Sequence, residues 1–308
     1  MIETEHLTKK YGDLVAVKDL NFKVEKGKIW GLLGPNAAGK TTTMRILTGY
    51  LPATEGRAVV AGYDVFEQAD AVKQSIGYLP ETVPVYPEMT VEAYLGFVAE
   101  IKKVPGSRKK AAVDRAVEIT GLQPVRKRLI KNISRGYKQR VGIAQALIHN
   151  PQVIILDEPT IGLDPAQIVE IRQLIKSLKG EHTVMLSTHI LAEVTQVCDG
   201  VVIINEGKLM ASGSLEELTT TYKEKDGVYL RLKKVDNEVL NLFRQLPGID
   251  NAHFEGSEIK LEWDRNKDMR EQIIKLCLEK QLGLLEMRSV AMNIEELYLR
   301  IVSGGMEQ

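Results

Sequence analysis

Short apolar runs, each about as long as a buried strand, recur through the first two thirds of the chain. They cover residues 28–33, 153–156 and 184–187, and a helical pattern at 39–48 follows the first run directly. Uninterrupted apolar runs of this length are typical of strands covered on both faces, as in a parallel sheet. The pattern predicts an α/β domain over residues 1–219.

A more polar stretch separates the first run from the second, and its periodicity is helical. Apolar positions recur at helical spacing over 91–102 and 108–121, and a further long helix is expected from Ser134 to Asn150-Pro151. We interpret residues from about 82 to 150 as a helical subdomain inserted between two segments of the sheet.

After residue 222 the pattern becomes that of a second, smaller domain. It predicts a strand, a helix, a hairpin, a helix, a strand and a last helix at 228–235, 238–245, 252–263, 268–280, 284–290 and 294–301. The order βαββαβ is that of the ferredoxin-like split βαβ unit. We therefore expect an α+β accessory domain over residues 220–308.

Composition narrows the class of protein. The 308 residues suit one large domain and one small one, and 41 basic and 41 acidic residues give a formal net charge of zero. This balance disfavours a nucleic-acid clamp or a polybasic membrane anchor. The amino terminus lacks a signal-peptide core and no apolar run has membrane-spanning length, so we expect a chain that does not cross a membrane alone. Cys198 and Cys277 match no metal or redox spacing and are interpreted as reduced thiols of a cytosolic protein.

The turn after the first apolar run carries the strongest candidate chemistry. Gly34, Gly39, Lys40 and Thr41 satisfy the pattern G-x-x-x-x-G-K-[ST] between an expected strand and an expected helix. In such a loop, backbone N–H groups and the helix dipole converge on a triphosphate, the lysine reaches the β- and γ-phosphates, and the threonine binds Mg²⁺. We predict an ATP site with Mg²⁺ whose phosphate-binding residues are Gly34, Pro35, Asn36, Ala37, Ala38, Gly39, Lys40, Thr41 and Thr42.

Two acids end the second apolar run. Asp157 would bind the Mg²⁺ held by Thr41, and Glu158 would lie beside the γ-phosphate and polarise a water as general base. On its own, the acidic pair is equally well explained as a strand cap followed by a solvated turn. That alternative is poor beside a phosphate loop.

Two further segments are candidates for the same site. Ser134 and Gly136 open the long helix and would form another anion site, although for these residues alone a plain N-cap is the better interpretation. Asp164 lies in a turn after the acidic pair. His189 follows the third run, at the strand end where α/β sites form, although a lone histidine there is more often structural.

In their order and spacing, these residues resemble the nucleotide-binding subunit of an ABC transporter over about residues 1–215. The resemblance implies that Tyr11 stacks on adenine with Val17 beside it. It also implies that Glu81 occupies the Q-loop position, which touches Mg²⁺ and senses the membrane partner.

The same resemblance implies a site shared between two chains. Ser134 and Gly136 would cap the ATP of the opposite subunit, Asp164 would lie in the D-loop between the sites, and His189 would contact the γ-phosphate. Glu158 and His189 would be catalytic. The expected partners are a second copy or a paralogous ATPase subunit, and a separate membrane-spanning permease that holds the chain at the cytoplasmic face; no nucleic-acid partner is expected.

Some positions depart from the commonest family pattern. Ala37 stands where glycine is usual, which costs about 1 kcal/mol if that position has positive φ, and Glu81 replaces glutamine. The signature segment has Arg135 and Tyr137 beside its serine and glycine, and Ile161 replaces a serine. With the extra C-terminal domain, the Glu81, Arg135 and Tyr137 variants look like the ABC-2 type exporters.

Two alternatives remain at this level. A non-transport ABC ATPase of DNA maintenance or translation is disfavoured because there is no sustained heptad between Lys40 and Ser134, only one ATPase half, and no excess of positive charge. A module that senses ATP without hydrolysing it is disfavoured because Glu158 and His189 are both present. The accessory domain could be a dimer prop, a ligand sensor or a stabilising lid, and we favour a structural role.

Overall fold

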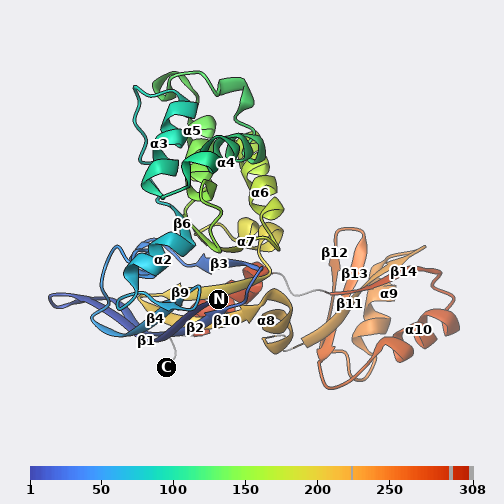
Figure 1. Ribbon diagram of the computed structural model, residues 1–308. Helices are drawn as coiled ribbons and strands as arrows, with labels where there is room; N and C mark the ends of the chain where they lie inside the picture. Colours follow the sequence, from blue (N-terminus) through green and yellow to red (C-terminus); the bar gives the residue numbers. More distant parts are fainter. Residues whose placement is uncertain (223–224, 291–293, 305–308) are drawn as a thin grey trace. The chain divides into compact units, whose positions relative to one another are not determined.

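The structure is a computed structural model that describes residues 1–222, 225–290 and 294–304. The chain forms two compact units, a larger one built on Met1–Leu215 together with the described residues from Arg300 onward, and a smaller one on Glu216–Leu299 (Figure 1). The boundary expected at residue 219 falls inside helix α8 (Leu215–Thr221), a few residues after the division seen here.

The larger unit contains an antiparallel sheet with the strand order β2-β1-β4-β5. Its strands are β1 (Ile2–Tyr11), β2 (Leu14–Val24), β4 (Glu55–Val60) and β5 (Tyr63–Asp64). Irregularities in register interrupt the β1–β2 ladder three times, between Thr4 and Lys10. One face of this sheet packs on helix α1 (Lys40–Leu47) and on the central sheet, with Leu20, Val24 and Val60 fully buried in the shared core.

The central sheet has the order β10-β9-β3-β8-β7-β6. It comprises β3 (Ile29–Leu33), β6 (Ile76–Leu79), β7 (Val153–Asp157), β8 (Thr183–Thr188), β9 (Gly200–Asn205) and β10 (Lys208–Ser214). All neighbours are parallel except β9 and β10. All residues of β3, β7 and β8 are buried, as the three apolar runs predicted. The carboxyl ends of these three strands therefore meet at one edge.

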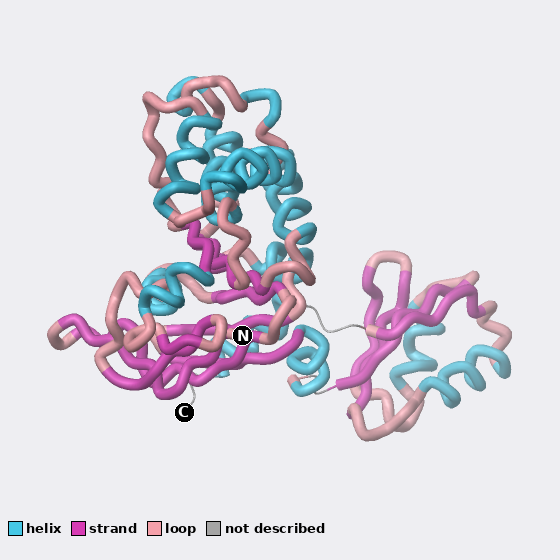
Figure 2. Tube along the Cα trace, viewed as in Figure 1, coloured by secondary structure: helices cyan, strands magenta, loops and turns pink. Residues whose placement is uncertain are grey.

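Helices surround the sheets and also form a separate lobe. The helices are α1 (Lys40–Leu47), α2 (Ala69–Ser75), α3 (Val91–Ile101), α4 (Gly106–Ile119), α5 (Arg135–Leu147), α6 (Pro165–Ser177) and α7 (Leu191–Val197), with 3₁₀ turns at Gln123–Val125 and Ile130–Asn132. Helices α3, α4 and α5 share a core of their own, which includes Leu95, Val117 and Val141. This lobe is the expected helical subdomain, and Figure 2 shows it as a cluster of cyan helices beyond the magenta strands.

The smaller unit has the predicted order of elements. They are β11 (Lys225–Leu232), α9 (Asn237–Arg244), β12 (Asn251–Glu255), β13 (Glu258–Asp264), α10 (Arg270–Glu279) and β14 (Leu284–Ser289). Helix α11 (Ile294–Gly304) follows, and its residues from Arg300 are grouped with the larger unit, so the smaller unit ends before the bound of 308 that the sequence predicted. The sheet order β12-β13-β11-β14 is fully antiparallel, which is the ferredoxin-like arrangement. Trp263 and Phe243 are fully buried at its centre.

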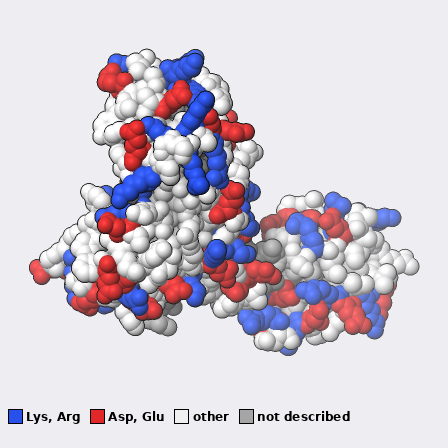
Figure 3. Space-filling model, in the orientation of Figure 1, with Lys and Arg blue, Asp and Glu red and all other residues white. Residues whose placement is uncertain are grey.

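Charged side chains are interspersed on the visible face of each unit. Figure 3 shows lysines and arginines beside aspartates and glutamates over the helical lobe and over the sheets. This mixture agrees with the formal net charge of zero. In the described residues, no helix is both long and apolar enough to serve as a membrane span.

Candidate functional site

The loop between β3 and α1 is shaped by two glycines that have no room for a side chain. A Cβ on Gly34 would lie 2.3 Å from the carbonyl oxygen of Ile204, and Gly39 has φ 99° and lies against the carbonyl oxygen of Ala16. The helix begins at Lys40, so its free N–H groups face the loop. A cavity of about 800 Å³ opens above it. The predicted loop residues that line it are Asn36, Ala37, Ala38, Gly39, Lys40, Thr41 and Thr42.

Ala37 has φ 65°, the left-handed conformation that glycine adopts freely and alanine does not. The positive φ that the sequence analysis made the condition for a strain of about 1 kcal/mol is therefore present at Ala37. The loop keeps this shape because its neighbours hold it: the Ala38 N–H donates to Pro35, and Gly207 donates from the β9–β10 turn to the carbonyl oxygen of Ala38 at 3.1 Å.

Lys40 lies almost buried across the loop. Its ammonium donates to the carbonyl oxygens of Gly34 at 2.8 Å and Pro35 at 3.1 Å, and it lies 3.4 Å from Oε1 of Glu158. These contacts bring the predicted phosphate ligand and the predicted general base to the same point. A cation held there by neutral carbonyls can also bind an anion that enters the cavity.

Asp157 is the best candidate for a metal ligand. Its side chain is 1% exposed, and Oδ1 accepts from the Ser187 hydroxyl at 2.5 Å, with the Thr41 hydroxyl at 3.5 Å. Its second oxygen, Oδ2, is buried and has no partner among the described residues. An unpartnered buried carboxylate oxygen is costly, and a divalent cation would satisfy it. Thr41 and Asp157 therefore fit Mg²⁺.

Most of the remaining ligands of the metal would not be side chains of aspartate, glutamate or histidine. In the described part of the chain, no three His, Cys, Asp or Glu residues gather as a metal-binding group. Phosphate oxygens and water are the usual remaining ligands of Mg²⁺. Burial raises the pKa of the neighbouring Tyr78 to about 12, and the charge of Asp157 adds to this rise, so Tyr78 stays neutral.

Glu158 and His189 form the candidate catalytic pair. His189 Nδ1 lies 3.0 Å from Oε2 of Glu158, and both residues line the cavity above the phosphate loop. Glu158 has φ 48°, which strains a residue that is not glycine. The Glu158 N–H donates to the Ser187 hydroxyl at 2.9 Å, and the same hydroxyl donates to Asp157. Ser187 therefore holds both Asp157 and Glu158.

A buried acid that the sequence did not reveal links the two loops beside this pair. Glu193 in α7 is 2% exposed, and its carboxylate accepts from the hydroxyls of Thr160 and Thr188, the latter at 2.6 Å. Arg172 lies 3.5 Å away. Thr160 follows the acidic pair and Thr188 precedes His189, so Glu193 fixes both segments. The spacing of Glu193 after His189 matches no pattern that would have singled it out.

Ser134, Gly136 and Asp164 lie together but apart from the phosphate loop. Ser134 caps α5 by accepting from Tyr137, and Asp164 caps α6 by accepting from the N–H of Gln167 at 2.9 Å. A Cβ on Gly136 would lie 2.7 Å from the Gln167 side chain, so glycine permits this close approach. The three residues line a second cavity, of about 350 Å³, that shares no lining residue with the first.

Of the remaining predicted residues, only one faces the first cavity. Glu81 is exposed and lines it. Tyr11 is 44% exposed at the end of β1 and is not among the lining residues, while Val17 is fully buried behind Gly39. Pro35 contributes its carbonyl oxygen to Lys40. Leu14, Val15 and Ala16 also line the cavity, although the sequence did not single them out. They follow Tyr11 closely in the sequence.

Comparison with known proteins supplies an independent view. The family model described as ABC transporter matches residues 17–161. The bacitracin transport ATP-binding protein of Bacillus licheniformis is 36% identical, over 99% of this chain and 98% of its own length. The linearmycin resistance ATP-binding protein of Bacillus subtilis (strain 168) is 30% identical, over 98% of each chain.

Solved structures are similar as well. An ATP binding subunit of an ABC transporter has a TM-score of 0.66 at 28% identity, covering 72% of this chain and 93% of that chain. The protein cbiO1 from Clostridium perfringens, described as part of an ABC transporter complex, has a TM-score of 0.65 at 27% identity, covering 80% of this chain and 95% of that chain.

Proposed function

Because this chain belongs to the ABC transporter family, as the ATP-binding and hydrolysing subunit that powers transport, we propose that its two cavities are halves of one composite ATP site. The phosphate loop of one chain would face Ser134 and Gly136 of another. The observation that carries this proposal is that the two cavities share no lining residue, although each presents groups that suit a phosphate. The partner is a second copy or a paralogous ATPase subunit.

The residues around the first cavity have complementary roles in this proposal. Lys40 and the loop N–H groups bind the β- and γ-phosphates, and Glu158 takes a proton from the attacking water. His189, 3.0 Å from Glu158, orients that carboxylate and contacts the γ-phosphate. Thr41 and Asp157 would hold Mg²⁺, with Glu81 at the cavity edge, and the ion would supply positive charge beside the phosphates. Tyr11 and Val17 form the adenine side of the site.

The proposed partner in the membrane is a separate permease of the ABC-2 exporter type, with this chain peripheral on its cytoplasmic face. The support is the likeness over nearly the full length, including the accessory domain, to proteins named for bacitracin transport and linearmycin resistance. We propose an antibiotic as the exported substrate. Deleting the gene should lower resistance to such a compound, and unchanged resistance to every antibiotic tested would count against this assignment.

A mixing experiment tests the composite site. Lys40→Ala disables the phosphate loop, while Ser134→Asp keeps an N-cap on α5 but adds a negative charge where a phosphate would lie. Each variant alone should lose ATPase activity, and a mixture of the two should regain part of it, since one dimer site combines both intact halves. If no activity returns on mixing dimeric variants, the two halves do not belong to one shared site.

The matched control places both substitutions in one chain and mixes it with the wild type. That mixture cannot form an intact site in the mixed dimer, so it should gain nothing beyond the activity of wild-type dimers.

The catalytic assignment has its own test: Glu158→Gln should bind ATP, lose most hydrolysis and accumulate as a dimer. Full hydrolysis in that variant would remove Glu158 from the role of general base.

A further inference from the structure

A third cavity, of about 530 Å³, lies on the larger unit among segments that the ATP site does not use. Its walls come from α4, the end of α5, and the residues just before β7 and β8. It shares no lining residue with the other two cavities. Its volume is that of a site for a small ligand.

The charge of this cavity is of one sign. Lys102, Lys103, Arg108 and Arg115 line it, and none of the described residues lining it is aspartate or glutamate. Arg115 pairs with Glu181 outside the cavity at 3.0 Å. Lys103 and Arg108 make no ion pair within the described ranges. Lys102 donates to the carbonyl oxygens of Lys73 at 3.1 Å and Ile76 at 3.3 Å, and neither carbonyl neutralises its charge. A recess with this excess of positive charge concentrates anions from solution.

Two histidines add a different kind of polar group. His182 is 2% exposed, and its Nδ1 lies 2.6 Å from the carbonyl oxygen of Pro151, which can only accept a hydrogen bond. Nδ1 therefore carries a proton, and Nε2 is buried without a hydrogen-bond partner in the described structure; the Glu181 carboxylate, at 3.8 Å, is too far for a hydrogen bond. In the neutral ring, this nitrogen is an acceptor in need of a donor.

His149 repeats the pattern on the neighbouring wall. Its Nε2 lies 2.9 Å from the carbonyl oxygen of Ile76, and its buried Nδ1 has no partner among the described residues. Burial, with the charge of Lys102 adding to it, lowers the pKa of His149 to about 4, so the ring is neutral at physiological pH. Burial also lowers the pKa of Lys102. An anion beside Lys102 would favour its charged form.

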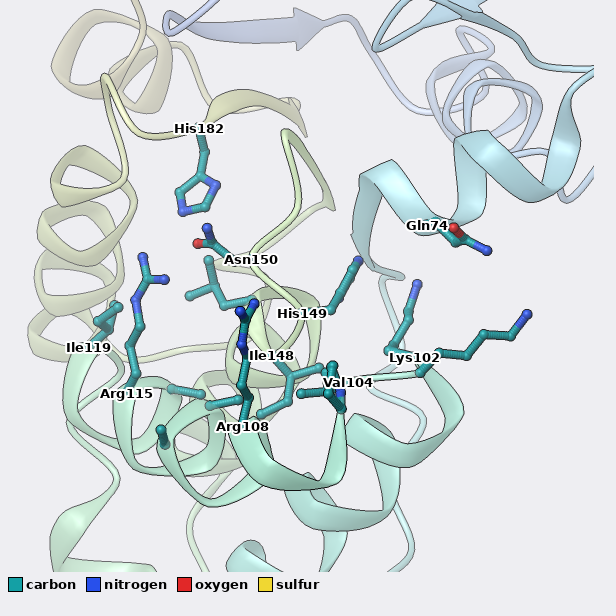
Figure 4. A pocket seen from close by; sticks show the side chains of 16 residues that line it. Gln74, Lys102, Val104, Arg108, Arg115, Ile119, Ile148, His149, Asn150 and His182 are labelled. Atoms are coloured by element: carbon teal, nitrogen blue, oxygen red, sulfur yellow. The ribbon is translucent and has the colours of Figure 1, made fainter.

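The side chains are arranged around a common space. Figure 4 shows Arg108 and Arg115 reaching from the helix at the bottom of the view toward Asn150 and His182 on the opposite wall, with His149 beside them. Arg108 and Arg115 are two turns apart on α4, about 10 Å along its axis. A molecule with several anionic groups can meet Arg108 together with the lysines that line the same cavity.

We propose that this cavity binds a small hydroxylated polyanion, such as a hydroxy-polycarboxylate or a sugar phosphate. Its anionic groups pair with Arg108, Lys102 and Lys103, and its hydroxyl donates to an unpartnered histidine nitrogen. The bound molecule joins α4, in the helical lobe, to the amino end of β8 in the central sheet. None of its lining residues lies in the first or second cavity, so binding does not require nucleotide to be present.

Calorimetric titration of the full chain without nucleotide or Mg²⁺ tests the proposal. The probes are citrate, ribose 5-phosphate and tricarballylate, which is citrate without its hydroxyl. We expect saturable binding of citrate or ribose 5-phosphate at one site per chain. Tricarballylate should bind about tenfold more weakly than citrate, which is the loss of one hydrogen bond worth about 1.4 kcal/mol.

Variants locate the binding. Arg108→Glu, on an exposed residue whose replacement leaves the core intact, should weaken binding at least about tenfold. Lys110→Glu makes the same change to the charge of the same helix outside the cavity and should have less than about a twofold effect. Lys40→Ala should bind the probes as the wild type does.

The proposal is overturned if neither citrate nor ribose 5-phosphate binds saturably. It is also overturned if Lys110→Glu weakens binding as much as Arg108→Glu, because the effect is then one of net charge. Loss of binding in Lys40→Ala would place the anion in the phosphate loop. Equal affinities for tricarballylate and citrate would remove the hydroxyl from the recognition. None of these results depends on ATP hydrolysis, so they leave the proposed transport function untouched.

Discussion

Replacing Ser187 by alanine removes a hydroxyl that serves two buried groups at once. The Ser187 hydroxyl donates to Oδ1 of Asp157 at 2.5 Å and accepts from the N–H of Glu158 at 2.9 Å. Ser187 is fully buried, and Asp157 and Glu158 are nearly so. Water cannot easily replace either contact, so the Glu158 N–H is left unsatisfied in the variant and Asp157 Oδ1 keeps only the Thr41 hydroxyl at 3.5 Å.

The loss of these two hydrogen bonds determines how far the free energy of unfolding falls. A hydrogen bond to a charged group is worth about 1.5–3 kcal/mol, and a buried N–H left without a partner costs about 1–3 kcal/mol. The two terms are not additive because they share one hydroxyl, so we expect the free energy of unfolding of the larger unit to fall by about 3 kcal/mol. Hydrolysis should fall as well, because both acids lose their support.

Tryptophan fluorescence can measure this change in the larger unit alone. The chain has two tryptophans, Trp30 in β3 and Trp263 in the smaller unit. In a Trp263→Phe background, urea unfolding followed by fluorescence reports on Trp30. Ser177→Ala is the control, since its hydroxyl donates to the Leu174 carbonyl at the end of α6, and its loss should cost about 0.5–1 kcal/mol. If Ser187→Ala and Ser177→Ala are equally stable, the reasoning is refuted.

Three further predictions concern single residues. Glu193→Gln should lower kcat for ATP hydrolysis about tenfold with ATP affinity kept, because one carboxylate oxygen that positions Thr160 or Thr188 becomes an amide; steady-state kinetics beside the exposed Glu118→Gln checks this, and equal kcat values for the two variants would contradict it. Ala37→Gly relieves about 1 kcal/mol of strain but adds freedom to the unfolded chain, so stability should change by less than about 1 kcal/mol. ATP should then bind equally well or more tightly, and a clear loss measured by nucleotide titration would mean that the loop needs alanine. Because burial lowers the pKa of His149 from 6.5 to about 4, the unfolded chain takes up a proton below pH 6.5 that the folded chain does not. The free energy of unfolding should therefore fall by about 1–2 kcal/mol between pH 7 and pH 5 because of His149. Urea titrations at the two pH values should show a smaller fall for His149→Gln, and an equal fall in variant and wild type would count against the lowered pKa of His149.

The parts of the fold that could be predicted from sequence are those with an unambiguous period. Strands β3, β7 and β8 are covered on both faces, so their sequences are uninterrupted apolar runs. The smaller unit was predictable because its strands alternate and its turns contain glycine. The antiparallel sheet of the larger unit was not predicted, because β1 and β2 alternate imperfectly where their register shifts and β5 has only two residues.

The site divides in a similar way. The phosphate loop was predictable because its glycines and lysine have fixed spacing, and the convergence of Asp157 and His189 follows from strand ends meeting at one edge. The roles of Ser187 and Glu193 depend on the pairing of β7 with β8 and on the packing of α7, which no local pattern encodes. Register places Asp157 opposite Ser187, and only the assembled sheet reveals this.

The hydrogen bond from Gly207 to the phosphate loop affects when that loop can form in the newly made chain. Gly34 lies against Ile204, and the Gly207 N–H donates to Ala38, so the loop is supported by residues that the ribosome adds about 170 positions later. A nascent chain that ends before β9 has a complete motif but lacks the support that holds Ala37 in its strained conformation. We therefore expect the capacity to hold a nucleotide to arise late in translation, when the turn between β9 and β10 leaves the exit tunnel, and not when the motif itself emerges.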